Sequence, residues 1–128
     1  MPPWYSYTMN YNIKGTGLEI TTELRSYVEK KLQTTDKFLS DDTSAHADVE
    51  LEYAIMRDGG KYRAEFTVTA ASSFYRKDEW GSTMHEAIDL AINGLVGELR
   101  QHKKKKIHLV RRGALVAKDF LRGLRDRF

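Results

Sequence analysis

Two alternating stretches, separated by an Asp-Gly-Gly turn, constrain the fold more than any other feature of the sequence. Apolar side chains recur at every second position from Val49 to Ile55 and again from Tyr62 to Ala70, with mostly polar residues between them. Because successive side chains of a strand point to opposite faces of a sheet, the pattern predicts two half-buried strands. The turn Asp58-Gly59-Gly60 supplies glycines that accept a positive φ, so we expect the strands to form a hairpin.

Two further strands are predicted on either side of this hairpin in the chain. Residues 11–14 form a short strand that Gly15-Thr16-Gly17 ends. After a turn at Ala71-Ser72-Ser73, Phe74 to Glu79 form a charged strand, which we expect near an edge of the sheet.

Helical spacing of apolar residues predicts two helices. The first runs from about Thr22 to Phe38, with Thr21 as its N-cap. The second begins at a capping box of Thr83 and Glu86 and ends in the lysines 103–106, whose charges suit the C-terminal end of the helix dipole. Its buried face is expected to comprise Met84, Ile88, Ala91, Ile92, Leu95 and Leu99. The order is β-α-β-β-β-α, an α+β fold in which two helices cover one face of a four-stranded sheet.

The last part of the chain differs in kind from this domain. After Arg111-Arg112-Gly113, one helical face carries apolar residues: Ala114, Ala117, Phe120 (or Leu121), Leu124 and Phe128. We predict a short basic amphipathic helix outside the main domain. The chain then divides into an N-terminal extension (1–8), an α+β domain (9–106) and a basic amphipathic tail (107–128).

Charge is distributed unevenly along the chain. Residues 100–128 carry eleven Lys and Arg and two Asp, a net charge of +9, whereas residues 1–99 carry a net charge of −6. A basic segment attached to an acidic body is typical of a protein that binds a polyanion. Cations that neutralise phosphates gain affinity by releasing counterions. Phe120 and Phe128 are the aromatic residues of this segment and fit its apolar face, so we expect recognition of RNA backbone and shape rather than of base sequence.

The composition and the motifs argue against several functions. The chain has no cysteine, which excludes disulfides and thiol nucleophiles and favours a reducing, cytoplasmic setting. The four histidines lack metal-binding spacing, and no P-loop, dinucleotide fingerprint or nucleophile elbow occurs. The acidic pairs Asp41-Asp42 and Glu50/Glu52 are interpreted as solvent-facing. Neither a signal peptide nor a membrane span is recognisable. We therefore expect no enzyme activity, cofactor, metal site, small-molecule substrate or membrane partner.

Residues 9–21 (MNYNIKGTGLEIT) resemble the start of the ribosome hibernation-promoting factors, a family of ribosome-associated inhibitors. Leu24-Arg25, Tyr27-Val28 and Lys31-Leu32 continue the resemblance, which covers about residues 9–105. Residues 83–89 (TMHEAID) are similar to a second family segment, and Leu99 with His102-Lys103 is similar to the family's basic helix end.

The resemblance implies a fold similar to that of a double-stranded-RNA-binding domain. It also implies binding to rRNA in the decoding region of the small ribosomal subunit, where the protein would block tRNA and mRNA binding in idle ribosomes. Long family members add a dimerisation domain for which the tail here is too short, so we expect no pairing through such a domain and a monomer off the ribosome.

The expected rRNA contacts combine the resemblance with the basic segment. Among them, Arg25, Lys31, His102 and Lys103 occupy basic positions that the resemblance implies. The full expected set is Lys14, Arg25, Lys31, Arg76, Arg100, His102, Lys103, Lys104, Lys105, Lys106, Arg111 and Arg112.

Three positions depart from the family pattern. Thr34, Gly94 and Gly97 stand where family members often carry Lys or Arg, which thins the basic face of both helices. A glycine inside a helix costs about 1 kcal/mol relative to alanine, so we predict that the two glycines serve close packing. The terminal helix is expected either to dock along the groove of Leu90, Gly94 and Gly97 or to carry the missing charge to RNA.

Two other interpretations stay open. The chain fits a general double-stranded-RNA-binding module, which would bind any A-form duplex of about 16 base pairs equally well. It also fits a protein-interaction or membrane-surface module that uses the basic tail as an amphipathic anchor.

Overall fold

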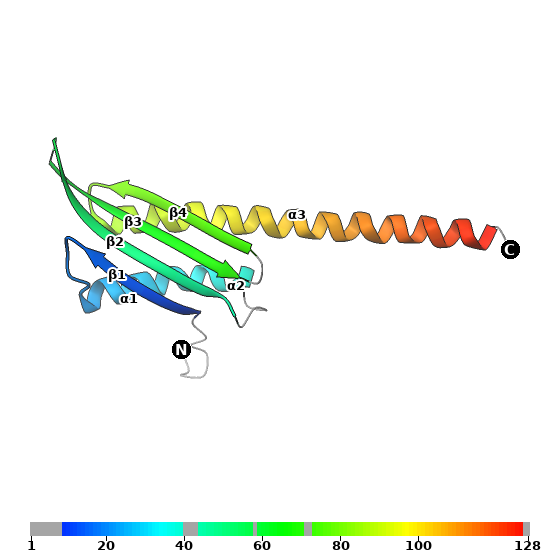
Figure 1. Ribbon diagram of the computed structural model, residues 1–128, viewed down its shortest axis with the longest axis horizontal. Helices are drawn as coiled ribbons and strands as arrows, with labels where there is room; N and C mark the ends of the chain where they lie inside the picture. The colour runs from blue at the N-terminus through cyan, green and yellow to red at the C-terminus, as the bar shows by residue number, and fades with distance from the viewer. Residues whose placement is uncertain (1–8, 40–43, 58, 71–72, 127–128) are drawn as a thin grey trace.

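The computed structural model describes residues 9–39, 44–57, 59–70 and 73–126, and for Gly60 and residues 106–126 it describes only the course of the backbone. A four-stranded sheet carries helices on one face, and one long helix projects away from it (Figure 1). The elements are β1 (Asn10–Thr16), α1 (Thr22–Leu32), the 3-10 turn η2 (Gln33–Thr35), α2 (Asp36–Leu39), β2 (His46–Met56), β3 (Gly59–Ala70), β4 (Ser73–Gly81) and α3 (Met84–Asp126). The predicted α+β fold with the order β-α-β-β-β-α is confirmed.

The sheet is mixed, with the strand order β1-β2-β3-β4. β1 pairs with β2 in parallel, placing Ile13 beside Val49, and the other two pairs are antiparallel. The parallel pair needs a crossover connection, which α1, η2 and α2 supply across the covered face. β4 lies at an edge of the sheet, as predicted.

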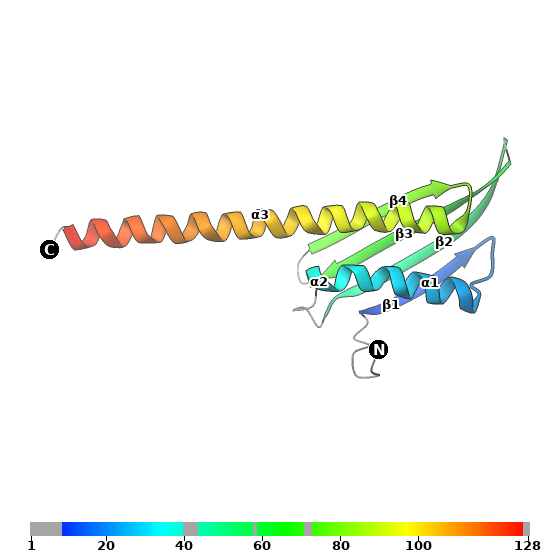
Figure 2. The same ribbon diagram turned by 180° about the vertical axis from the view of Figure 1, so that it is seen from behind.

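The core lies between the sheet and the helices, which cover one face (Figure 2). Val49 pairs with Phe66 across the hairpin, so the apolar alternations of β2 and β3 fall on the same face. Every residue predicted for the buried face of α3 is at most 6% exposed. The register of β2 and β3 continues without a break to Ile55, so Ile55 alternates onto the same face as Val49 and Leu51, but at 85% exposure it lies outside the core. The hairpin end of β2 and β3 extends beyond the helices (Figure 1).

Glycines with positive φ mark both predicted turns that the structure describes. Gly17 has a φ of 73°, and β1 continues to Thr16 before this turn, two residues further than predicted. Gly59 has a φ of 113° at the β2–β3 hairpin. The N-terminal extension 1–8, the pair Asp41-Asp42, the turn residue Asp58 and the turn residues Ala71-Ser72 lie outside the described residues.

The first predicted helix is interrupted at its C-terminal end. Its N-cap is confirmed, because Thr21 Oγ1 accepts a hydrogen bond from the Leu24 amide at 3.1 Å. α1 ends at Leu32, however, and the chain passes through η2 into α2. The hydroxyls of Thr34 and Thr35 donate to the carbonyl oxygens of Lys31 and Leu32, both at 2.6 Å. Such local hydrogen bonds compete with the regular helical pattern, which accounts for the tighter turn.

The second predicted helix is longer than its sequence pattern indicates. Its start is confirmed, because the Glu86 amide donates to Thr83 Oγ1 at 3.1 Å. The expected end at Lys103–Lys106 and the separate terminal helix are wrong, because α3 runs unbroken to Asp126. Lys, Arg, Leu and Ala favour helix at most positions after 102. The two glycines there, Gly113 and Gly123, cost about 1 kcal/mol each, too little to end the helix. The boundary between domain and tail at residue 106 stays a prediction.

Candidate nucleic-acid interface

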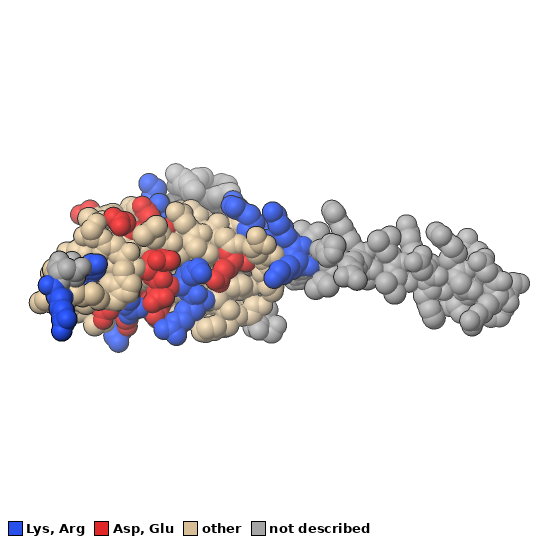
Figure 3. Space-filling model, turned by 90° about the horizontal axis from the view of Figure 1, so that it is seen from above, with Lys and Arg blue, Asp and Glu red and all other residues tan. Residues whose placement is uncertain are grey.

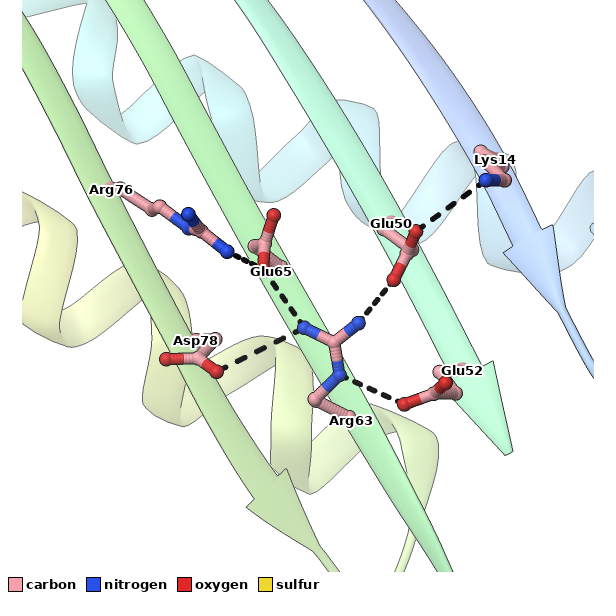
Figure 4. A network of polar contacts seen from close by, with 7 residues as sticks. All are labelled: Lys14, Glu50, Glu52, Arg63, Glu65, Arg76 and Asp78. Carbon is pink, nitrogen blue, oxygen red and sulfur yellow. Dashed lines mark hydrogen bonds and ion pairs between the residues drawn. The ribbon is translucent and has the colours of Figure 1, made fainter. Parts of the chain in front are cut away.

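The structure distributes the predicted rRNA-binding residues over two faces of the domain. Lys14 and Arg76 lie on the face of the sheet opposite the helices, which we call the open face (Figure 4). Arg25 and Lys31 belong to α1, and the residues from Arg100 onward belong to α3. The side chains of Lys106, Arg111 and Arg112 lie outside the described part of the structure. The predicted set is therefore not one continuous surface.

Acidic side chains neutralise the cations of the open face (Figure 4). Arg63, whose side chain is 14% exposed, donates from Nε to Glu52 and from Nη1 to Glu65, each at 2.9 Å, and from Nη2 to Glu50. Arg76 also donates to Glu65 at 2.9 Å, and Lys14 Nζ lies 3.8 Å from Glu50.

These contacts shift the ionisation of the open face toward the charged forms. Desolvation by burial is the largest single influence on the pKa of Arg63 and lowers it, but the hydrogen bonds that Arg63 donates to Glu52 and Glu65 outweigh it and raise the pKa. For Glu65, desolvation raises the pKa, and the hydrogen bonds from Arg76 and Arg63 together bring it below its usual range. Because its cations are paired, the open face offers little positive potential to a phosphate backbone.

Lys31 connects the two long helices. Its Nζ lies 3.1 Å from Asp89 Oδ1 in α3, and the Tyr27 hydroxyl donates to the same oxygen at 2.5 Å. The hydrogen bond from Tyr27, followed by that from Lys31, holds the pKa of the Asp89 carboxyl below its ordinary value. The hydrogen bond to Asp89 likewise raises the pKa of Lys31, so this lysine stays charged while holding α1 against α3.

Exposed cations gather beside the point at which α3 leaves the domain, on the face that Figure 3 shows. Lys37 of α2 and Lys103 of α3 approach the same aromatic ring, with their Nζ atoms 5.1 Å and 5.9 Å from the centroid of Phe38. His102 packs edge-on against Tyr75 of β4, with the ring centroids 5.5 Å apart. We name this group the exit cluster; it comprises Lys37, Arg100, His102, Lys103, Lys104 and Lys105, all exposed.

Sequence reasoning missed two residues of this arrangement. Lys37 enters the exit cluster because α2 ends beside α3, a contact between elements that no local pattern reveals. Arg63 is one of the polar residues that alternate with the apolar ones in β3, but its four acidic neighbours come from three strands. Alternation indicates which face a side chain occupies and leaves its cross-strand partners unspecified.

The two helical glycines differ in their surroundings. A Cβ atom at Gly94 would lie 2.9 Å from Cε of Lys77, whose Nζ reaches Glu98 at 3.1 Å. Close packing at Gly94 is confirmed. At Gly97 a Cβ atom would meet nothing within 4 Å, so close packing there is wrong. Docking of the terminal helix along Leu90, Gly94 and Gly97 is also wrong in this structure, because both segments belong to one unbroken helix.

The described residues hold no group of three or more His, Asp or Glu placed to bind a metal ion. Within the described part of the chain, no helix combines the length with the apolar character that crossing a membrane requires.

Comparison with known proteins identifies the domain. Residues 11–107 match the profile of the family described as Sigma 54 modulation protein / S30EA ribosomal protein. Curated relatives named ribosome hibernation promotion factor include those of Bacillus subtilis, 34% identical over 97 residues, and Lactococcus lactis, 27% identical over 97 residues. Both matches cover 76% of this chain. They span about half of each relative, 50% of the Bacillus subtilis protein and 51% of the Lactococcus lactis protein.

A solved structure agrees with the profile. The crystal structure of the Thermus thermophilus Protein Y N-terminal domain superposes with a TM-score of 0.63 at 30% identity, covering 74% of this chain and 98% of that domain. A ribosomal subunit interface protein from Coxiella burnetii, at 21% identity and a TM-score of 0.62, shares the fold. The resemblance found in residues 9–21 and 83–89 is therefore confirmed: the chain belongs to the Sigma 54 modulation protein / S30EA ribosomal protein family.

Proposed function

We propose that this protein is a ribosome-binding hibernation factor that inhibits translation. In this proposal it contacts rRNA in the decoding region of the small subunit and blocks the binding of tRNA and mRNA in idle ribosomes. Support comes from its family, from relatives named ribosome hibernation promotion factor and from its match to nearly all of the Protein Y N-terminal domain. Acting by occupancy, it would need no cofactor and no catalytic group, and it would work in the cytoplasm as a monomer.

The observation that carries the proposal is the anchoring of the exit cluster. The ring contact of His102 with Tyr75 and the approach of Lys103 to Phe38 fix the start of the basic helical segment against β4 and α2. The cations are thus positioned before binding, which reduces the conformational entropy lost when phosphates are contacted. Cations placed in this way gain affinity for a phosphate backbone through counterion release.

The orientation on RNA follows from the difference between the two faces. The open face pairs its cations with carboxylates, whereas the exit cluster presents Lys104 and Lys105, which are exposed and form no ion pair within the described part of the structure. We therefore propose that the helical layer and the exit cluster face the rRNA, with Arg25 extending the contact along α1. Lys31 supports this surface by holding α1 to α3.

Binding to vacant small subunits across a series of salt concentrations tests the proposal. The affinity of the wild-type protein should fall steeply as salt rises, and replacing Lys103, Lys104 and Lys105 by Gln should reduce the slope of log K against log salt by about 2 to 3. Lys14→Gln with Arg76→Gln is the matched control on the open face and should leave affinity and slope unchanged. Failure of the wild-type protein to bind at low ionic strength would refute the proposal.

Two competition experiments test its finer parts. Bound protein should prevent tRNA and mRNA from binding the same subunits, and simultaneous binding would overturn decoding-region occupancy. An A-form duplex of about 16 base pairs should compete poorly with the subunit. Equal affinity for the duplex would instead favour a general double-stranded-RNA-binding module.

A further inference from the structure

Three histidine side chains fall within the described part of the structure, and they differ in whether an acid lies beside them. Nε2 of His46 lies 3.1 Å from Asp48 Oδ1 in β2, and Nε2 of His85 lies 3.8 Å from Glu23 Oε1, between α3 and α1. His102 forms no hydrogen bond or ion pair within the described residues. Its ring nitrogens are therefore available to a ligand that comes from outside the chain.

The ring of His102 packs against an edge strand of the sheet. It meets Tyr75 of β4 at a centroid distance of 5.5 Å, with an angle of 89° between the rings. Lys77, two residues further along β4, and Glu98, one turn earlier in α3, pair with each other at 3.1 Å. The acid one turn away is therefore already engaged by a lysine, and the phenol of a tyrosine carries no charge near pH 7.

The other neighbours of His102 are cations. His102 is exposed, Lys103, Lys104 and Lys105 follow it in α3, and Lys37 joins the exit cluster from α2. A positive charge on the imidazole would thus lie among positive charges of the same sign. Like charges repel, so an anion that approaches from outside is what compensates a charge at this position.

The chemistry of an imidazole makes such a position sensitive to pH. Histidine is the side chain whose ordinary pKa puts its change of charge between pH 5 and pH 8. A phosphate in contact with the ring favours the protonated form, because opposite charges attract and both ring nitrogens then donate hydrogen bonds. The coupling is reciprocal: where phosphate binding promotes proton uptake, the proton strengthens phosphate binding by the same factor.

We propose that His102 takes up a proton when the exit cluster binds rRNA, so that acidification strengthens the binding of this protein to the small subunit. The proposal rests on the proposed function and adds a mode of regulation to it. His46 and His85 take no part, because each has an acid beside it that compensates its charge within the fold. His46 also lies on the open face, which the proposed orientation turns away from RNA.

The test is the affinity of the full chain for vacant small subunits at pH 7.5 and pH 6.0. The wild-type protein should bind at least about threefold more tightly at pH 6.0, and the slope of log K against log salt should steepen by roughly 0.5 or more, because a further phosphate is neutralised. His102→Gln, which cannot be protonated, should lose this gain. His102→Lys, which stays charged, should bind tightly at both pH values.

Matched variants separate His102 from the other histidines. His46→Gln and His85→Gln should keep the full gain at pH 6.0, and any titration of the subunit itself is common to every variant. Because His102 is exposed, thermal unfolding of its two variants should match that of the wild type at both pH values.

Two results would overturn the proposal. One is a gain at pH 6.0 that persists in His102→Gln, including the case in which His108→Gln abolishes it instead. The other is tight wild-type binding that is equal at both pH values, which would exclude the proton coupling and leave the proposed function standing. Absence of wild-type binding at either pH would instead refute the proposed function itself.

Discussion

Arg63→Met removes the guanidinium that carboxylates of the open face share, and it keeps most of the aliphatic stem. In the native protein Arg63 contacts Glu50, Glu52 and Glu65, whose side chains are 28%, 24% and 19% exposed, and lies 3.9 Å from Asp78. The substitution leaves these partly desolvated carboxylates close together with less compensating charge. We expect the variant to be strongly destabilised at neutral pH.

The magnitude follows from the burial of the network. Removing one partner of a fully buried ion pair costs about 3–5 kcal/mol. Because the side chains of Glu50, Glu52 and Glu65 are still 19% to 28% exposed and Arg76 still contacts Glu65, we discount this to about 2 kcal/mol. For a domain of about 100 residues, such a loss lowers Tm by roughly 8–16 °C.

The pH dependence gives the prediction a definite sign. The folded-state pKa of Glu65 lies below its ordinary value of 4.5, so its contribution to the free energy of unfolding is fully present above that value and is lost as the pH falls through the folded-state pKa. In Arg63→Met the remaining carboxylates repel one another while ionised and stop doing so once protonated. The stability difference between wild type and variant should therefore be largest near pH 7 and should narrow below about pH 4.5.

Chemical denaturation at pH 7 and pH 4, followed by circular dichroism, measures this difference. Arg76→Met is the matched control. The Arg76 side chain is 60% exposed, and Glu65 is its one ion-pair partner within the described residues, so this substitution should cost less than about 1 kcal/mol. A cost below 1 kcal/mol for Arg63→Met, or an equal cost at both pH values, would show that the network does not stabilise the sheet as argued.

Three further predictions concern local structure. Gly97→Ala should stabilise α3 by about 0.5–1 kcal/mol because its new Cβ meets open space, whereas Gly94→Ala should gain little because its Cβ would lie 2.9 Å from Cε of Lys77. Comparing the denaturant midpoints of the two variants tests this, and equal gains would contradict the packing assigned to Gly94. Gly17→Ala should lower the free energy of unfolding by more than about 1–2 kcal/mol, because φ is +73° and the new Cβ would lie 2.5 Å from the Tyr53 carbonyl oxygen. Thermal unfolding measures this loss, and a loss near zero would mean that the turn rearranges freely. Thr83→Ala should cost about 1 kcal/mol by loss of the cap on α3, and Thr83→Ser should restore most of it; failure of serine to do so would argue against the hydrogen bond to the Glu86 amide as the cause.

The sequence by itself determined the elements and the face that each buries. Alternation in β2 and β3, together with the spacing of Met84, Ile88 and Leu95 in α3, depends on the period of each backbone and on the exclusion of apolar surface from water. Both patterns involve residues close together in the chain, so a single sequence is enough to detect them. The N-caps Thr21 and Thr83 were likewise predictable, because a cap and its amide lie three residues apart.

Tertiary structure decided what depends on contacts between distant segments. The parallel pairing of β1 with β2, the four carboxylates around Arg63 and the meeting of Lys37 with Lys103 at Phe38 join residues far apart in the sequence. The length of α3 was missed for a related reason. A change in composition at residue 107 resembles a boundary, yet helix propagation continues wherever no residue breaks the backbone hydrogen-bond pattern.

The candidate site shows the same division. Its cations were visible in the sequence as a charged segment, since net charge needs no fold to be counted. The sequence did not show how these cations divide into a paired open face and an exposed exit cluster. The distance from each cation to a carboxylate is set by strand register and helix packing. Composition determined that this protein would present positive charge, and the fold decided which of those charges are left to meet a partner.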